Sequence, residues 1–274
     1  MKKRISITLD EKILKKVDEL VNGLRIRSRS DAIEKLLERQ IGKRKYAVIL
    51  AGGNPERLII KGTKIFRPLV KIKNFYLIED IVLKCRDAGF ENVLIPGFPS
   101  ILSKIYEVLG DGRKYNVRIT YVEEERELGS AKTLELTKDY IESDFLLLPC
   151  DQWMDFDLKE FYDFHLAMGG IATLAIHTRT TFDWKMGVVS LKGYRIVEYD
   201  EMPRTPKTRL VSTFTCFMKP EIFEYIPPGN VKWSLQENVF PRLAKEGKLI
   251  GYPILGNWVN VHSLKDVEKV KSLL

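Results

Sequence analysis

The chain has 274 residues, which is longer than a typical single domain and favours a two-domain protein. Hydrophobic residues make up 45% of it, enough for a sizeable core, which excludes an intrinsically disordered chain. No apolar run approaches the roughly 20 residues of a membrane span, and the first residues do not resemble a signal peptide, so we expect a soluble, cytoplasmic protein.

Charged residues are frequent and unevenly placed. Residues 1–45 carry 14 Lys and Arg against 7 Asp and Glu, a net charge of +7, whereas the remainder carries 31 against 30. A concentrated basic segment is typical of a protein that binds a polyanion, most commonly nucleic acid. The alternative, a solvated basic tail, is disfavoured by the ordered pattern of these residues. Frequent Lys and Glu with scarce Gln suggest a thermophilic source.

The first forty residues predict one strand followed by two helices. Residues 4–9 alternate between polar and apolar side chains, as in a strand with one apolar face. Asp10 is a suitable N-cap for a helix in residues 11–24, and Ser28 or Ser30 for a second helix. The apolar face of the strand consists of Ile5, Ile7 and Leu9, and its polar face of Arg4, Ser6 and Thr8.

These three elements are too few to close a core of their own. Their one-sided apolar faces therefore require a second copy, and we expect a homodimer formed through this segment. Two such strands paired antiparallel make a two-stranded ribbon of the size that fits the major groove of DNA.

Residues 3–42 resemble the ribbon-helix-helix repressors of the Arc and MetJ type, in the alternating strand, the capped helix and the Arg29-Ser30 pair that opens the second helix. The resemblance implies operator DNA as a partner, with side chains at base edges and a phosphate at a helix N-terminus. A dimerisation element that never contacts DNA is the alternative. The implied DNA contacts are Arg4, Ser6 and Thr8 at bases, and the backbone of Ser28, Arg29 and Ser30 at a phosphate.

The chain after a basic linker, residues 43–45, has a different pattern. Residues 46–51 are an apolar run that ends in Gly52-Gly53, which predicts a buried parallel strand and a tight turn. Alternating strands and helices predict a doubly wound, Rossmann-like α/β sheet with ligands at the strands' carboxyl ends. The further expected strands are 92–96, 117–122 and 144–149, and the expected helices are 101–109 and 131–141.

Residues 46–272 resemble the sugar-phosphate nucleotidyltransferases, a GT-A-like fold whose members join a nucleoside triphosphate to a sugar 1-phosphate and release pyrophosphate. The resemblance rests on seven motifs in chain order. They are Leu50–Leu58 (L-A-G-G-x-G-T-R-L), Phe66–Val70 (P-K-P-L-V), Glu125–Ala131 (E-x-P-L-G-T-A), Cys150-Asp151 (G-D), Gly187–Val189, Glu201–Pro203 (E-K-P) and Trp258–Val261 (W-x-D-I).

By this resemblance, the ligand is a nucleotide, a nucleotide sugar or a sugar phosphate. Mg²⁺ would be the implied cofactor, with Asp151 as its ligand, and an active enzyme would use Arg57, Arg67 and Asp151 in catalysis. The residues implied to bind the ligand are Ala51, Gly52, Gly53, Arg57, Arg67, Gly129, Ser130, Asp151, Gly187, Glu201 and Asn260.

Five departures from the motifs weaken the expectation of activity. Pro55 removes an N–H donor from the phosphate loop, and Glu56 brings negative charge toward a polyphosphate. Arg67 keeps the charge of the usual Lys with a different geometry. Met202 replaces the cation that would hold the sugar phosphate, and Asn260 removes one of two metal carboxylates. Positioning and charge neutralisation dominate phosphoryl transfer, so an impaired transferase is favoured.

Three hypotheses follow. The favoured one is a DNA-binding transcriptional regulator whose nucleotidyltransferase-like domain, residues 46–274, senses a ligand. The second is an active sugar-1-phosphate nucleotidyltransferase whose ribbon-helix-helix module, residues 1–42, provides dimerisation or autoregulation. The third is a C-terminal domain that serves only as a scaffold for oligomer assembly.

Overall fold

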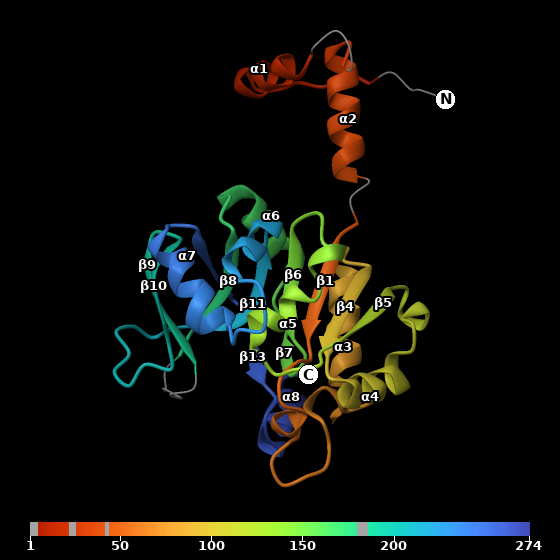
Figure 1. Ribbon diagram of the computed structural model, residues 1–274, viewed down its shortest axis with the longest axis vertical. Coiled ribbons are helices and arrows are strands. Elements are labelled where there is room, and N and C mark those ends of the chain that lie inside the picture. The colour runs from red at the N-terminus through yellow and green to blue at the C-terminus, as the bar shows by residue number, and fades with distance from the viewer. Residues whose placement is uncertain (1–4, 22–25, 42–43, 180–185) are drawn as a thin grey trace. The chain divides into compact units, whose positions relative to one another are not determined.

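The computed structural model describes residues 5–21, 26–41, 44–179 and 186–274 (Figure 1). They form two compact units, Met1–Arg44 and Lys45–Leu274, each described here by itself. Among the described residues, every helix is too short or too polar to cross a membrane.

The first unit contains two helices with the expected caps. Asp10 accepts a hydrogen bond from the Lys12 N–H (2.8 Å) at the start of α1 (Glu11–Leu20). Ser28 Oγ accepts one from the Asp31 N–H (3.1 Å) at the start of α2 (Arg29–Ile41). These bonds satisfy N–H groups that have no partner inside the helix. The two helices pack together, with Val17 and Ala32 buried.

Residues 5–9 belong to no strand in the structure, contrary to the expectation from their alternation. A strand needs a hydrogen-bonded neighbour, and the neighbour expected for this segment is the same segment of a second copy. Ile5 and Ile7 are 73% and 50% exposed, and Leu36 and Leu37 of α2 are exposed as well. The apolar surface that a dimer would cover is therefore present. Arg4 lies outside the described residues.

The second unit is built on a mixed nine-stranded sheet in the order β5-β4-β1-β6-β11-β8-β12-β10-β9. Strands β5, β4, β1 and β6 run parallel, and β11 lies antiparallel to both β6 and β8. The strands are β1 (Tyr46–Leu50), β4 (Asn92–Gly97), β5 (Arg118–Glu123), β6 (Phe145–Pro149), β8 (Ala172–Thr178), β9 (Gly187–Lys192), β10 (Arg195–Glu201), β11 (Leu210–Met218) and β12 (Leu249–Pro253). Two small ladders are added, β2 (Lys71–Ile72) with β3 (Phe75–Tyr76) and β7 (Gln152–Met154) with β13 (Trp258–Asn260).

Helices pack on both faces of this sheet (Figure 1). Ala47 and Ile49 of β1 enter one core and Val48 and Leu50 the other, which explains the unbroken apolar run in the sequence. The α-helices are α3 (Leu77–Asp87), α4 (Pro99–Leu109), α5 (Ser130–Glu135), α6 (Leu158–Met168), α7 (Phe240–Lys245) and α8 (Leu264–Leu273). The short helical turns are η1 (Pro55–Leu58), η2 (Arg67–Leu69), η3 (Arg113–Tyr115), η4 (Lys138–Tyr140), η5 (Pro220–Tyr225) and η6 (Leu235–Val239).

The helix expected over residues 131–141 is divided in two. α5 ends at Glu135, and the 3₁₀ turn η4 follows it. The Thr137 hydroxyl donates a hydrogen bond of 2.7 Å to the carbonyl of Leu134. A threonine that bonds back to the preceding turn disfavours continuation of a regular helix.

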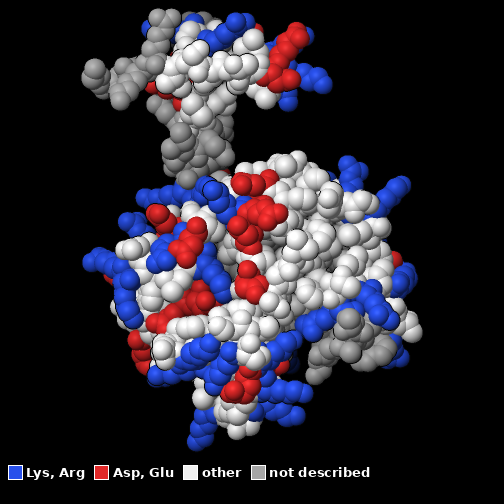
Figure 2. Space-filling model, turned by 180° about the vertical axis from the view of Figure 1, so that it is seen from behind, with Lys and Arg blue, Asp and Glu red and all other residues white. Residues whose placement is uncertain are grey.

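The surface of the second unit carries charges of both signs. On the face that Figure 2 shows, Lys and Arg side chains lie largely around the periphery, acidic side chains form several groups, and a broad uncharged area lies between them. This mixture agrees with the near-neutral total of residues 46–274, 31 basic against 30 acidic. The excess positive charge of the sequence therefore lies in the N-terminal residues 1–45.

Candidate functional site

A cavity of about 500 Å³ opens at the carboxyl ends of β1 and β6. The two strands pair so that Leu50 lies opposite Pro149, which brings the loop after each strand to the same edge. Ligands of α/β sheets bind at such edges. The predicted ligand residues that line this cavity are Gly52, Gly53, Gly129, Ser130, Asp151, Gly187, Glu201 and Asn260.

Three other predicted residues lie around the cavity rather than in its wall. Ala51 is fully buried behind the loop. Arg57 is largely exposed, with its Nη1 3.6 Å from a carboxylate oxygen of Glu127. Arg67 contacts Asp151.

The glycine pair after β1 packs against a buried carboxylate. The Gly53 N–H donates to Glu124 Oε2 (2.9 Å), and the Thr133 hydroxyl donates to Glu124 Oε1 (2.7 Å). A Cβ atom at Gly52 would collide with both of these side chains, so only glycine fits there. Burial raises the pKa of Glu124, although the two hydrogen bonds oppose this shift. An N–H that the resemblance assigns to phosphate is thus already satisfied by a carboxylate.

Two further N–H groups of this loop are bonded within the turn, and a third is missing. Pro55 starts the 3₁₀ turn η1 and has no N–H to offer. The Glu56 N–H donates to the Asn54 side chain (2.9 Å), and the Arg57 N–H to the Asn54 carbonyl (3.0 Å). A phosphate-binding loop works by leaving such donors free, and here they are used within the turn.

The position expected to bind metal holds a network of side chains. Arg67 Nη1 lies 2.9 Å and His262 Nε2 3.2 Å from the same oxygen, Asp151 Oδ2. Burial favours the neutral acid, but the hydrogen bonds and charges of His262 and Arg67 outweigh it and lower the pKa of Asp151. The ladder between β7 and β13 pairs Asn260 with Gln152, directly beside Asp151.

This donor set does not fit a magnesium ion. One carboxylate oxygen already accepts from two basic side chains, and the neighbouring position is a neutral amide in Asn260. Mg²⁺ is bound through carboxylates, waters and substrate phosphates in near-octahedral geometry. Across the part of the chain that the structure describes, no three His, Cys, Asp or Glu residues are grouped to hold a metal.

The other half of the cavity contains Gly187, Glu201 and Met202, the positions that the resemblance places at the sugar. The Tyr199 hydroxyl donates to Glu201 Oε2 (3.0 Å), and a Cβ atom at Gly187 would collide with that hydroxyl. Burial raises the pKa of Glu201. The Tyr199 hydrogen bond lowers it again, and the charge of Glu237 adds to the increase.

Two strained residues line the same cavity. Met202 has φ of 47° and Phe214 has φ of 69°, the left-handed region that bulky side chains rarely adopt. Phe214 lies in the irregularity where β11 departs from regular pairing with β8, between Ser212 and Cys216. Strain of this kind persists where surrounding structure enforces it, often at binding sites.

Sequence reasoning missed several of these residues. Glu124 lies in a charged run, residues 123–127, whose sequence is equally consistent with a solvated loop, and its contact with Gly53 spans 71 positions. Tyr199 and Phe214 carried no motif. Glu237 could be found only through the fold, because η6 brings it to the cavity.

In the first unit, the predicted DNA contacts Ser6, Thr8, Ser28 and Ser30 are exposed. The Arg29 guanidinium forms two bonds to the Asp18 carboxylate, of 2.6 and 2.8 Å, which lower the pKa of Asp18. This pair joins α1 to α2. The Arg29 side chain is therefore structural here, which leaves the predicted role of its backbone unaltered.

Comparison with known proteins assigns each of the two units to a family. Residues 46–273 match the family described as nucleotidyl transferase, and residues 3–44 match the ribbon-helix-helix proteins of the copG family. A solved structure of a Bacillus anthracis protein named as a glucose-1-phosphate thymidylyltransferase, in complex with sucrose, has the same fold. The TM-score is 0.75 at 19% identity, and the match covers 84% of this chain and 94% of that one.

Relatives by sequence include two enzymes of sugar-nucleotide synthesis. The glucose-1-phosphate adenylyltransferase of Fervidobacterium nodosum is 26% identical over 249 residues, covering 81% of this chain and 59% of that protein. The mannose-1-phosphate guanyltransferase of Saccharomyces cerevisiae is 26% identical over 230 residues, covering 80% and 62%. This chain thus spans about three fifths of each relative. It belongs to the nucleotidyl transferase family and carries a ribbon-helix-helix module at its N-terminus.

Proposed function

We propose that this protein is a DNA-binding transcriptional regulator whose nucleotidyl transferase domain senses a ligand without transferring a nucleotide. The observation that carries the proposal is the state of Asp151. Its carboxylate is held by Arg67 and His262. The neighbouring position, where the family motif has a second carboxylate, is occupied by the neutral amide of Asn260. The arrangement that would neutralise a reacting triphosphate is replaced by a closed ion-pair network.

The phosphate loop supports the same conclusion. Its N–H groups at Gly53, Glu56 and Arg57 are bonded within the protein, and Pro55 offers none. Nucleotidyl transfer depends on holding the polyphosphate in line and balancing its charge. A loop that has lost these four donors holds and neutralises a polyphosphate less well, whereas the cavity itself keeps a volume of about 500 Å³, within the range of ligand pockets.

DNA binding is supported by the first unit. Its net charge of +7 over residues 1–45, the exposed polar positions Ser6 and Thr8, and the match to the copG family agree. The exposed apolar residues Ile5 and Ile7 support dimerisation through this unit. A homodimer would then place two copies of the strand in one groove of an operator.

The ligand is a nucleotide, a nucleotide sugar or a sugar phosphate, the molecules that the resemblance implies. Sensing requires that the ligand bind the DNA-competent and incompetent states with different affinity. The coupling free energy that is typical of such proteins, about 1–3 kcal/mol, corresponds to a change of roughly 5- to 150-fold in DNA affinity.

Pyrophosphate release separates this proposal from an active transferase. The full chain is incubated with Mg²⁺ and a panel of nucleoside triphosphates and sugar 1-phosphates. Asp151→Ala serves as the test variant, and Asp163→Ala, an exposed position on α6, as its matched control. We expect no turnover by any of the three. Turnover that disappears in Asp151→Ala and persists in Asp163→Ala would overturn the proposal and establish a sugar-1-phosphate nucleotidyltransferase.

A further inference from the structure

The first turn of α2 contains both satisfied and free backbone donors. The Asp31 N–H bonds Ser28 Oγ at 3.1 Å, and the Arg27 N–H bonds Asp31 Oδ2 at 2.9 Å. Among the described residues, none accepts a hydrogen bond from the N–H groups of Ser28, Arg29 or Ser30. Free donors of this kind favour an anion. The geometry therefore agrees with the phosphate contact proposed for this backbone.

The Arg29 side chain extends from the same turn but is held elsewhere. Its Nε and Nη2 lie 2.6 and 2.8 Å from the two carboxylate oxygens of Asp18 on α1. Such a bidentate pair fixes the plane of the guanidinium as well as its position. Asp18 therefore neutralises a cation that would otherwise lie beside the free donors of α2.

The pair contributes little to folding stability. The Arg29 side chain is 60% exposed and the Asp18 side chain 41%, so water and salt screen their attraction. The two helices also pack together through the buried Val17 and Ala32. Removal of the pair should leave the unit folded, and its main effect is on the charge that the turn presents to DNA.

We propose that Asp18 limits the affinity of this protein for DNA, because it holds the Arg29 guanidinium away from the phosphate at the N-terminus of α2. The inference rests on the proposed DNA-binding function and adds a residue that sets the strength of binding. Without the Asp18 charge, the guanidinium donates to that phosphate in a charge-assisted contact. A ligand-controlled regulator needs such a limit, since a DNA site that is bound too tightly stays occupied when a ligand lowers the affinity.

A charge-matched pair of variants tests this inference. Fluorescence anisotropy measures binding of the full chain to the DNA fragment that the parent chain selects from a random pool. Asp18→Asn is compared with Glu19→Gln, which removes the same charge from the next residue of α1, an exposed position that is not bonded to Arg29. We expect Asp18→Asn to bind at least about threefold more tightly than Glu19→Gln. Its plot of log affinity against log salt should be steeper by roughly one unit per protomer.

The double variant Asp18→Asn/Arg29→Ala identifies the source of the gain. It should no longer bind more tightly than Glu19→Gln, and calorimetry should show that every variant melts cooperatively. Equal or weaker binding by Asp18→Asn than by Glu19→Gln would overturn the inference while leaving DNA binding intact. A gain that survives in the double variant would also overturn it, because Arg29 would not be its cause. A parent chain that selects no DNA from the pool would contradict the proposed DNA-binding function and this inference together.

Discussion

Asp151 stands at the position that the family motif assigns to a metal ligand, but basic side chains surround it here. Its carboxylate is 13% exposed and the Arg67 side chain 19%, so each needs the other to remain charged away from water. Asn260 contributes no charge at the neighbouring strand position. The Asp151–Arg67 pair is consequently part of the stability of this domain.

Asp151→Ala should lower the free energy of unfolding by about 2 kcal/mol, because it leaves the Arg67 guanidinium partly buried without its carboxylate. Urea denaturation at pH 7 measures the change. Asp163→Ala on the surface of α6 should stay within about 0.5 kcal/mol of the parent chain. Equal stability of Asp151→Ala and the parent would show that the pair does not form in solution.

Removal of divalent metal should leave the protein unchanged. The oxygen that would bind Mg²⁺ accepts from Arg67 and His262, so neither a chelator nor millimolar Mg²⁺ should shift the melting temperature. Differential scanning calorimetry with and without EDTA measures this directly. A melting temperature that rises with Mg²⁺ concentration would mean that the metal displaces Arg67.

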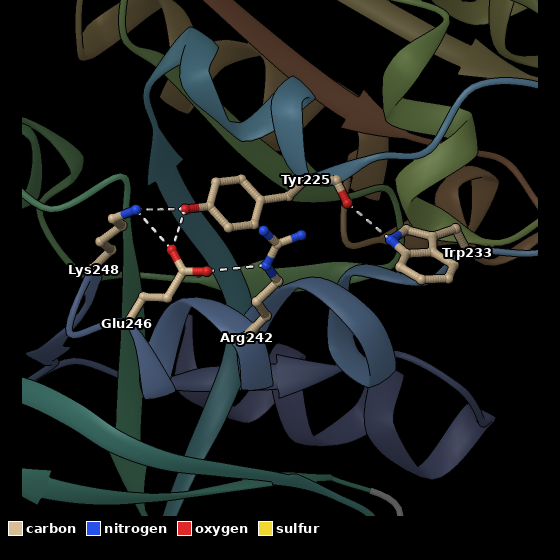
Figure 3. Close-up of polar contacts among 5 residues, drawn as sticks. All are labelled: Tyr225, Trp233, Arg242, Glu246 and Lys248. Carbon is tan, nitrogen blue, oxygen red and sulfur yellow. Dashed lines mark hydrogen bonds and ion pairs between the residues drawn. The ribbon is translucent and has the colours of Figure 1, made fainter.

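At the scale of elements, a polar cluster fixes the carboxyl end of α7 (Figure 3). Glu246 accepts hydrogen bonds from Lys248, the Tyr225 hydroxyl and Arg242, at 2.7, 2.6 and 3.0 Å. The Trp233 Nε1 donates to the Tyr225 carbonyl at 3.0 Å. A carboxylate at a helix carboxyl end faces the negative end of the helix dipole, so its cations are what make this position favourable.

These bonds lower the pKa of Glu246 to about 2, with Lys248 as the largest cause. A carboxylate whose pKa is depressed on folding stabilises the protein above its unfolded pKa, near 4.3, and this contribution disappears as the pH falls through the folded pKa. We therefore expect the melting-temperature difference between the parent chain and Glu246→Gln to be constant above about pH 5 and to shrink between about pH 4.5 and 2. A difference that stays constant down to pH 2 would contradict the lowered pKa.

The elements that depend on short-range sequence patterns were predicted correctly. The apolar run of β1 and the caps of α1 and α2 were readable, because burial on both faces and capping leave direct signatures in sequence. The strand expected over residues 4–9 is not formed in its described part, residues 5–9, since its pairing partner is expected to lie in another copy.

The site was less predictable, for physical reasons. The motifs located the cavity walls, but they could not show that Glu124 would take the Gly53 N–H or that His262 would reach Asp151. Both contacts join segments far apart in the chain. Phe214 lines the cavity at the point where β11 pairs irregularly with β8. The residue types in this part of β11 do not predict such an irregularity.

For the molecule as a whole, DNA recognition should depend on the polar face of the N-terminal segment. Simultaneous replacement of Arg4, Ser6 and Thr8 by alanine should abolish specific binding and leave the dimer intact, because these side chains are predicted to point away from its core. Electrophoretic mobility shift measures binding, and analytical ultracentrifugation measures the dimer. Affinity of the parent chain should also fall steeply with salt. Loss of the dimer in the triple variant would show that the face assignment is reversed.

The most direct test of a ligand-sensing regulator is the affinity of the full chain for a DNA fragment selected from a random pool. That affinity is measured by fluorescence anisotropy at fixed salt, with and without each nucleotide, nucleotide sugar and sugar phosphate. We predict that at least one ligand changes it by roughly fivefold or more, and that Asp151→Ala, which disrupts the cavity, reduces the change. Tight DNA binding that no ligand of these classes alters would contradict the account.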